Sequence, residues 1–311
     1  MSFSSKAKND LARILPEKRC CQLAEMLALI RMDGTIQISS DQNVAVQLKT
    51  ENAAVARKFI ILGKQLFQLV LNIAVQRKTR LKKNNVYIVK IPPQEKAKDI
   101  LQSLGIKIMG QSAQIDWNVG TLSKKCCCRA YLRGAFLGGG SVSNPEGTYH
   151  LEIISRDDFH VKLLCEMMES LQMEPKVSRR KQWYVIYLKE SEQIINFLNI
   201  IGAYSALLDF ENARILKDMR NRVNRLVNCE TANLNKTVDA GMRQVDNIRY
   251  LISRIGYAGL PDSLQEVARL RLENPEASLK ELGELLVPPV SKSGINHRLR
   301  RLEKMVEKMR K

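Results

Sequence analysis

The stretch YLRGAFLGGGSVSNP, residues 131–145, runs from small and apolar residues into three consecutive glycines and then a Ser-Val step. A related stretch, LAEMLALIRMDGTIQI, lies upstream at residues 23–38. The two align at an offset of 106 residues, which matches Ala24 with Ala130, Ala28 with Gly134, and Gly34 with Gly140. The chain therefore contains an internal duplication.

The duplication continues beyond the glycines. VYIVKI, residues 86–91, corresponds to YVIYL, residues 184–188, and both are rich in residues that favour β-strands. Each precedes a helical segment that ends at Gly105 or Gly202. We expect each copy to fold as helix, strand, strand, helix, strand, strand and helix.

Small residues give the first helix of each copy a face suited to close packing. Ala24 and Ala28 are four residues apart, as are Ala130 and Gly134, so each pair lies on one side of its helix. Two such helices can approach closely and would join the copies into one pseudo-symmetric domain. The glycines at 138–140 then end the second helix and let the backbone turn sharply into a strand.

This pattern resembles the LAGLIDADG homing endonucleases over about residues 15–205. The resemblance implies two paired helices, a saddle of strands on DNA, and an acidic residue before each terminal glycine that binds divalent metal ions. The first copy has Asp33 at that position, whereas the second has Gly139. Because one carboxylate holds hard divalent ions poorly, we expect Asp33 to be vestigial, with no catalytic residue, no metal site and no cofactor.

The net charge of +18 indicates a polyanionic partner, such as nucleic acid or an acidic membrane, with a solvated basic surface as the alternative. Residues 1–110 hold 19 basic and 8 acidic side chains, whereas residues 111–204 hold 11 and 10. Five basic residues concentrate in one hairpin of the first copy: Arg77, Lys78, Arg80, Lys82 and Lys83. We expect this hairpin to contact phosphates, although a basic tip can also be merely solvated. The second copy is expected to have lost part of any such surface.

From about residue 205 onward the pattern is helical without strand signals. Apolar residues at helical spacing run from Ile215 to Leu226, stop near Asn228–Asn235 and resume up to Ile255, which predicts separate helices of a small bundle. The segment RNRVNRLVNCETANLNK, residues 220–236, is rich in Arg and Asn. These side chains suit phosphates and base edges, and buried polar links between helices are an equal alternative.

The last segment, residues 261–311, predicts a helix-turn-helix domain. One helix lies between Pro261 and Asn274, a second begins at the capping box Ser278 and Glu281, and a third follows a short break. The N-terminal part of the third helix supplies the candidate DNA-binding residues Ser291, Lys292, Ser293, Asn296, His297, Arg298, Arg300 and Arg301. Asn and Arg suit base edges, while Lys and hydroxyls suit phosphates. Binding of this basic amphipathic helix to a membrane or a protein is the alternative.

The combination is similar to the WhiA family of bacterial transcriptional regulators, with a close match over RNRVNRLVNCETANLNK and ASLKELGELLVPPVSKSGINHRLRRL. The resemblance implies promoter binding, contact with RNA polymerase or its sigma factor, loss of nuclease activity, and roles in sporulation or cell division. We expect double-stranded DNA as the partner and a monomer in the cytoplasm, associated with the nucleoid. A nucleoid protein of low sequence choice and a residual metal-dependent endonuclease are the alternatives.

The remaining features indicate what the chain does not carry. No run of 18 apolar residues occurs and the N-terminus lacks the apolar core of a signal peptide, so no membrane partner is expected. The seven cysteines include adjacent pairs that lack the usual spacing of a zinc site, and we expect reduced thiols in helix packing, with a labile metal or redox site as the alternative.

The predicted fold is α+β, a duplicated LAGLIDADG-like αββαββα domain followed by an all-α helix-turn-helix domain. The first repeat is expected over residues 1–110 and the second over 111–204, both in one domain. A helical linker or bundle is expected over 205–260, and the helix-turn-helix domain over 261–311.

Overall fold

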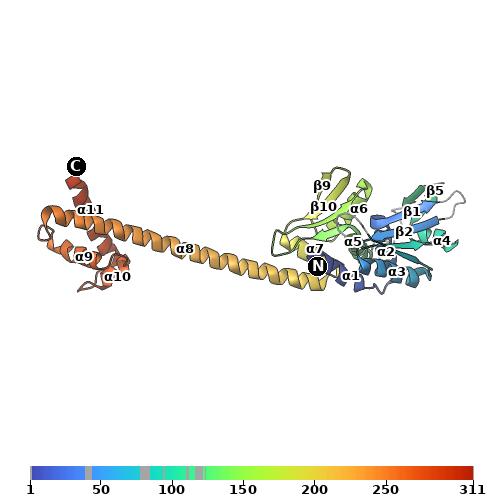
Figure 1. The fold of residues 1–311 in the computed structure, drawn as a ribbon, viewed down its shortest axis with the longest axis horizontal. Coiled ribbons are helices and arrows are strands. Elements are labelled where there is room, and N and C mark those ends of the chain that lie inside the picture. The colour runs from blue at the N-terminus through green and yellow to red at the C-terminus, as the bar shows by residue number, and fades with distance from the viewer. Residues whose placement is uncertain are drawn as a thin grey trace. The chain divides into compact units, whose positions relative to one another are not determined.

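The structure, a computed structural model, describes residues 2–38, 44–77, 85–93, 95–109, 112–115, 122 and 124–310. The chain divides into two compact units, Met1–Lys217 and Asp218–Lys311, and each is described by itself. The first contains helices and two four-stranded sheets, and the second is helical (Figure 1). The predicted α+β class is confirmed.

The first unit contains the two copies in the predicted order of elements. The first copy comprises α2 (Arg19–Asp33), β1 (Gly34–Ile38), β2 (Val44–Thr50), α3 (Ala53–Phe67), β3 (Asn72–Arg77), β4 (Asn85–Ile91) and α4 (Glu95–Ser103). The second comprises α5 (Lys125–Gly139), β7 (Gly140–Val142), β8 (Leu151–Ser155), α6 (Asp158–Ser170), β9 (Lys176–Arg180), β10 (Trp183–Leu188) and α7 (Ser191–Ile201). Both sheets are antiparallel and share one topology, with strand orders β1-β2-β4-β3 and β7-β8-β10-β9. The duplication predicted from the sequence is therefore structural.

Helices α2 and α5 pack against each other, as their small residues predict. Ala24, Ala28 and Ala130 are buried. A Cβ added at Gly134 would lie 2.6 Å from the carbonyl oxygen of Glu25 and 2.8 Å from the Cβ of Ala28. Such distances are below van der Waals contact, so this crossing requires glycine.

Three further elements of the first unit, one helix and two strands, were not predicted. Helix α1 (Phe3–Arg13) packs against α3 and α5 and buries Ala7 and Leu11. Strands β5 (Ile106–Met109) and β6 (Ser112–Ile115) form a two-stranded hairpin between the copies. Helix α1 also brings Lys8 close to Asp33, the last residue of α2.

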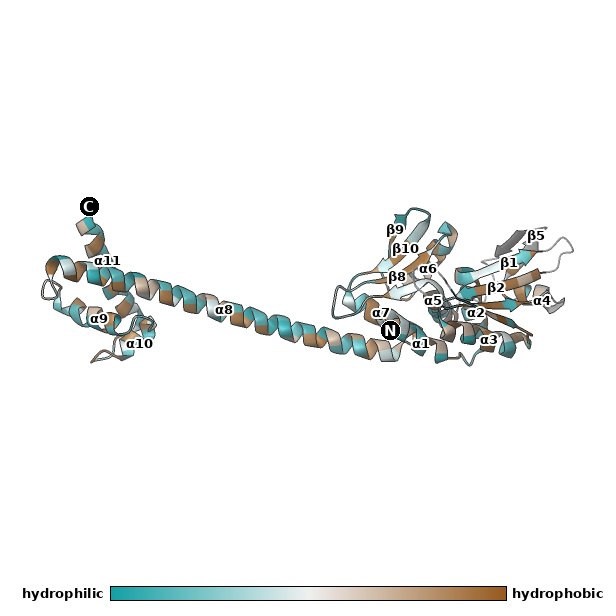
Figure 2. Cartoon of the chain, viewed as in Figure 1, coloured by the Kyte–Doolittle hydropathy of each residue, from teal (hydrophilic) through white to brown (hydrophobic). Residues whose placement is uncertain are grey.

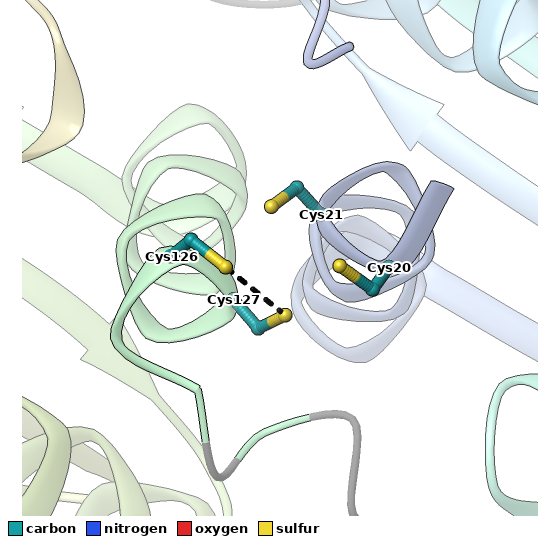
Figure 3. A group of neighbouring side chains, drawn as sticks. All are labelled: Cys20, Cys21, Cys126 and Cys127. Carbon is teal, nitrogen blue, oxygen red and sulfur yellow. Dashed lines mark hydrogen bonds between the residues drawn. The ribbon is translucent and has the colours of Figure 1, made fainter. Parts of the chain in front are cut away.

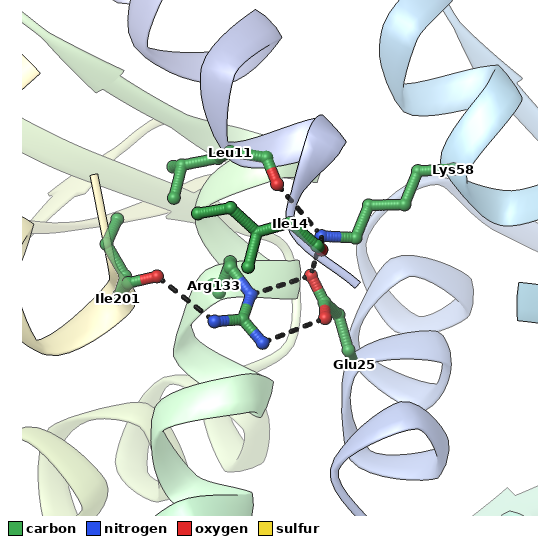
Figure 4. Close-up of polar contacts among 6 residues, drawn as sticks. All are labelled: Leu11, Ile14, Glu25, Lys58, Arg133 and Ile201. Carbon is green, nitrogen blue, oxygen red and sulfur yellow. Dashed lines mark hydrogen bonds and ion pairs between the residues drawn. The ribbon is translucent and has the colours of Figure 1, made fainter. Parts of the chain in front are cut away.

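A buried ionic network joins the two copies (Figure 4). The Glu25 carboxylate accepts hydrogen bonds from Nε and Nη2 of Arg133, at 3.0 and 3.1 Å, and pairs with Lys58 Nζ at 2.5 Å. Lys58 also donates to the carbonyl oxygens of Leu11 and Ile14, and Arg133 donates to that of Ile201. Burial lowers the pKa of Lys58 to about 8, against the opposing effect of Glu25. Each charge has a partner, as burial requires.

Helix α8 (Tyr204–Ile255) is continuous over 52 residues, so the predicted interruption near Asn228–Asn235 is wrong. The helix contains no proline that would interrupt it. Residues 221–236 are exposed on all sides, and a helix that packs against nothing has no apolar face for the sequence to show. The alternative of buried polar links between helices is wrong for the same reason. Figure 2 shows hydrophilic and hydrophobic residues alternating along α8, where Val223 and Leu226 are exposed.

The second unit forms the predicted helix-turn-helix around one apolar core. Its helices are α9 (Asp262–Glu273), α10 (Leu279–Glu284) and α11 (Lys292–Arg310). The core joins Leu264, Leu282 and Ile295 to Ile248 and Leu251 of α8. The C-terminal end of α8 therefore belongs to the core of this domain, although the sequence placed it in a separate segment.

Among the helices in the described ranges, none combines the length and apolar character needed to cross a membrane.

Candidate nucleic-acid interface

Helix α11 presents one apolar and one basic face. Ile295, Leu299, Leu302 and Val306 are buried in the domain core. The opposite face is exposed and carries Ser293, His297, Arg300, Arg301 and Lys304. Because residues three and four apart lie on one side of a helix, these five form a continuous surface. Lys304 belongs to this surface but was not predicted from the sequence. Its spacing of four and three residues from Arg300 and Arg301 could have indicated that it lies on the same face.

The remaining predicted residues lie beside that surface or at the helix start. Asn296 and Arg298 are only partly exposed and flank the buried stripe on opposite sides. Ser291 caps the helix, since its Oγ accepts a hydrogen bond from the amide of Gly294 at 3.3 Å. Lys292 is exposed in the first turn, where free amides and the helix dipole favour anions. The structure thus places Lys292 at the start of the helix, apart from the outward face.

Local interactions fix the turns that orient α11. The capping box of α10 is present, with Ser278 N donating to Glu281 Oε2 at 2.7 Å and Glu281 N donating to Ser278 Oγ at 3.3 Å. The hydrogen bond from the Ser278 amide lowers the pKa of Glu281. The Val290 amide donates to the Gly283 carbonyl, where an added Cβ would lie 2.1 Å from the Val290 oxygen. Gly283 therefore permits the close approach of the chain before α11.

Buried Arg271 closes the turn between α9 and α10. Its Nη1 donates to the carbonyl oxygens of Asn274, Pro275 and Ala277, the last at 2.6 Å. Burial lowers the pKa of its guanidinium. Arg271 is thus a structural residue of the domain and does not contribute to its basic surface.

The helix-free face of the first sheet carries two exposed lysines among other residues. Along β2 and β4 it carries the exposed residues Lys49 and Lys90, beside Gln47, which is buried, and the half-buried Ile88. Arg77 is exposed and lies directly opposite Asn85 in the β3–β4 pair. Asn85 and Val89 are four residues apart on β4 and share one face of the sheet, so Arg77 lies on the face of buried Val89, which is turned toward the helices. Lys78, Arg80, Lys82 and Lys83 lie outside the described residues.

The second sheet carries a basic and aromatic surface that the sequence reasoning missed. Lys176 and Arg180 on β9 pair with Tyr187 and Trp183 on β10, on the face away from buried Ile186. The guanidinium of Arg156 lies 4.0 Å from the centroid of the Trp183 ring, within cation–π distance. The net charge of the second copy gave no sign of this surface, because acidic residues elsewhere in the copy offset its basic residues. The alternation of the strand residues was the signal that could have shown it.

The C-terminal ends of α2 and α5 differ as their sequences do. Asp33 ends α2, and burial raises its pKa to about 7 against the lowering effect of Lys8 on α1. At the matching end of α5, an added Cβ on Gly139 would lie 2.2 Å from Met32 Cε and 2.8 Å from the Ile154 carbonyl oxygen. A carboxylate at 139 would not fit this packing. In the described residues, the one group with suitable geometry for a metal consists of cysteines and contains no carboxylate.

A cavity of about 1060 Å³ opens beside Asp33. Its lining includes Lys8, Arg13, Lys49 and Arg57, with Ser4 and Ser141. Basic residues outnumber acidic ones there, which favours an anion such as phosphate over a cation.

The helix-turn-helix has an exposed basic face, and the duplicated domain has basic residues on the outer faces of its sheets. Together these features define a DNA-binding protein of two parts. The family models described as "WhiA N-terminal LAGLIDADG-like domain", "WhiA LAGLIDADG-like domain" and "WhiA C-terminal HTH domain" match residues 19–107, 128–220 and 223–306. The chain belongs to the WhiA family.

Similar proteins span nearly the whole chain. It is 57% identical over 307 residues to "Probable cell division protein WhiA" of Heliobacterium modesticaldum, covering 99% of this chain and 96% of that protein. It is 58% identical over 311 residues to the protein of the same name from Desulforamulus reducens, covering 100% and 97%. The crystal structure of full-length DUF199/WhiA from Thermatoga maritima covers 99% of both chains with a TM-score of 0.61 and 24% identity, and supports the fold.

Proposed function

We propose that this chain is a sequence-specific, DNA-binding transcriptional regulator without nuclease activity. The observation that carries the proposal is the basic face of α11, which lies opposite the buried stripe of a helix-turn-helix. The relatives are named probable cell division proteins, which supports a role of this chain in cell division. The accompanying proposals are a monomer at the nucleoid in the cytoplasm, a link to sporulation, and contact with RNA polymerase or its sigma factor.

The residues of α11 divide the work. Arg300 and His297, with Asn296 on the flank one turn before Arg300, are assigned to base edges in the major groove. Lys292 and Ser291 at the helix start are assigned to phosphates. The outer sheet faces, including Lys90 and the surface of Lys176, Arg180, Arg156 and Trp183, add phosphate affinity without sequence choice.

The test begins with selection of preferred duplexes from a random pool by the full chain, followed by titration against selected and random DNA at two salt concentrations. We expect Arg300→Ala to lower the ratio of selected to random affinity by about 1–3 kcal/mol. Asn296→Ala should act in the same direction. Lys292→Ala should weaken both DNAs alike and lower the salt slope by about one unit. The matched control is Lys308→Ala, which removes the same charge from the last turn of α11.

The outcomes separate the alternatives. If Arg300→Ala and Asn296→Ala weaken selected and random DNA in equal proportion, the assigned reading face is wrong. If selection yields no preferred sequence while affinity remains high, the chain is a nucleoid protein of low sequence choice. Circular dichroism of each variant confirms that the domain is folded.

The absence of nuclease activity is tested separately. We expect no cleavage of plasmid or linear DNA in Mg²⁺ or Mn²⁺, because the position of α5 that matches Asp33 is Gly139 and two carboxylates are needed to hold the ions. Steady cleavage that Asp33→Ala abolishes would establish the endonuclease alternative.

A further inference from the structure

Four cysteines from the two copies meet at the N-terminal ends of α2 and α5 (Figure 3). Cys20 and Cys21 lie in the first turn of α2, and Cys126 and Cys127 lie in the first turn of α5. The four sulfur atoms all lie within 4.8 Å of one another, and those of Cys126 and Cys127 are 3.9 Å apart. None of the four forms a disulfide. Two adjacent cysteines do not by themselves have the spacing of a metal site. The packing of α2 against α5 nevertheless brings together two such pairs that are 106 positions apart in the sequence, and so assembles four possible ligands.

The sulfur positions match the requirements of a single thiophilic ion. Zinc binds thiolates at about 2.3 Å, so two sulfurs at a tetrahedral angle lie about 3.8 Å apart. The observed sulfurs reach that arrangement if the cluster contracts by about an ångström or less. Four thiolates around one divalent ion form a closed structural site, without an open position for substrate.

The surroundings compensate the charge that such a site would carry. Two basic residues directly precede each pair, Lys18 and Arg19 in one copy and Lys124 and Lys125 in the other, and all four are exposed. The N-cap residues Lys18 and Lys124 make no side-chain capping hydrogen bond. The positive ends of two helix dipoles therefore point at the sulfurs, and they offset part of the effect of burial, which raises the pKa of the Cys21 and Cys127 thiols.

We propose that Cys20, Cys21, Cys126 and Cys127 bind one Zn²⁺ ion in a tetrahedral site that joins α2 to α5. Binding replaces four S–H bonds with four Zn–S bonds and releases four protons to solvent, with no change of oxidation state. The ion links the two copies at the end of the helix pair opposite Asp33. Cys128 is excluded because its Sγ donates to the Leu122 carbonyl at 3.1 Å. The site does not depend on the DNA-binding proposal.

The test uses the full chain, purified with reduced thiols and without chelator. Elemental analysis should find one zinc per chain. After zinc removal, titration with Co²⁺ should produce the absorption bands of tetrahedral thiolate-bound cobalt, saturating at one equivalent, and Zn²⁺ should abolish them. Cys21→Ser and Cys127→Ser should lose these bands. The matched controls Cys128→Ser and Cys229→Ser, on α5 outside the cluster and on exposed α8, should retain them.

A second measurement uses the unmodified chain, so that the test does not depend on whether the cysteine variants fold. In the unmodified chain, Zn²⁺ should slow alkylation of the four cluster cysteines by at least about tenfold, as read by mass spectrometry, while Cys229 reacts unchanged. The proposal is overturned if reduced protein gives no cobalt bands, if Zn²⁺ protects none of the four thiols, or if Cys229→Ser removes the bands equally. Iron in place of zinc, or a disulfide among the four in reduced preparations, would also overturn it.

Discussion

The two copies share one backbone plan but differ in the side chains at their junction. Both have the same strand order, and both have a first helix that ends directly in a strand at Gly34 or Gly140. At the junction the first copy contributes buried Glu25, whereas the aligned residue of the second is Tyr131, bonded to His160 at 2.9 Å. The first helix ends in Asp33 and the second in Gly139. Duplication preserved the arrangement of elements, while the contacts between the copies became asymmetric.

The largest expected effect comes from the buried charge. Glu25→Ala leaves Lys58 and Arg133 without their carboxylate and should lower the free energy of unfolding by about 3–5 kcal/mol. The matched change in the other copy, Tyr131→Phe, removes one neutral hydrogen bond and should cost about 1 kcal/mol. Urea unfolding followed by fluorescence and circular dichroism measures both. Equal costs would mean that the network does not distinguish the copies.

The next effect depends on pH. Asp33 titrates near 3.8 when unfolded and near 7 when folded, because burial disfavours its charge. Between these values the folded chain keeps a proton that the unfolded chain has lost, so this residue makes stability fall as pH rises. Asp33→Asn should match the parent near pH 4 and exceed its stability near pH 7 by on the order of a few kcal/mol. A constant difference across this range would show that Asp33 is not buried as described.

The smallest effect concerns packing at the end of α5. Gly139→Ala should cost about 1–3 kcal/mol, because the added Cβ meets the backbone oxygen of Ile154, which cannot move independently of its strand. The control is Gly147→Ala in the same copy, where the nearest atom is the Asn144 carbonyl oxygen at 3.6 Å. Thermal unfolding compares the two. A neutral Gly139→Ala would mean that the second carboxylate was lost without a packing constraint.

Sequence reasoning succeeded where the decisive interactions are local or repeated. The spacing of Ala24 and Ala28 predicted the close helix pair, and the spacing of Ser278 and Glu281 predicted the capping box. Gly202 ends α7 with a positive φ of 85°, as a helix-terminating glycine should.

It failed where contacts join distant residues or where apolar periodicity is not needed. The cysteine cluster and the proximity of Lys8 to Asp33 depend on elements far apart in sequence. Within α8, the loss of apolar spacing near Asn228 indicated solvent exposure on all sides, which periodicity alone does not distinguish from a helix break. The assignment of individual DNA contacts stays a prediction.

The Glu25 network also determines which helices can pair at all. If α2 packed against α2 of a second copy by the same symmetry, Glu25 would face the aligned residue Leu27 in place of Arg133. If α5 packed against another α5, Arg133 would face Tyr131 and find no carboxylate. Pairing of α5 with itself would leave Arg133 without a carboxylate, and pairing of α2 with itself would leave Glu25 with Lys58 alone, so the arrangement penalises exchange of repeats between molecules. Pairing of α2 with α5 inside one chain therefore satisfies all three buried charges, which neither self-pairing does.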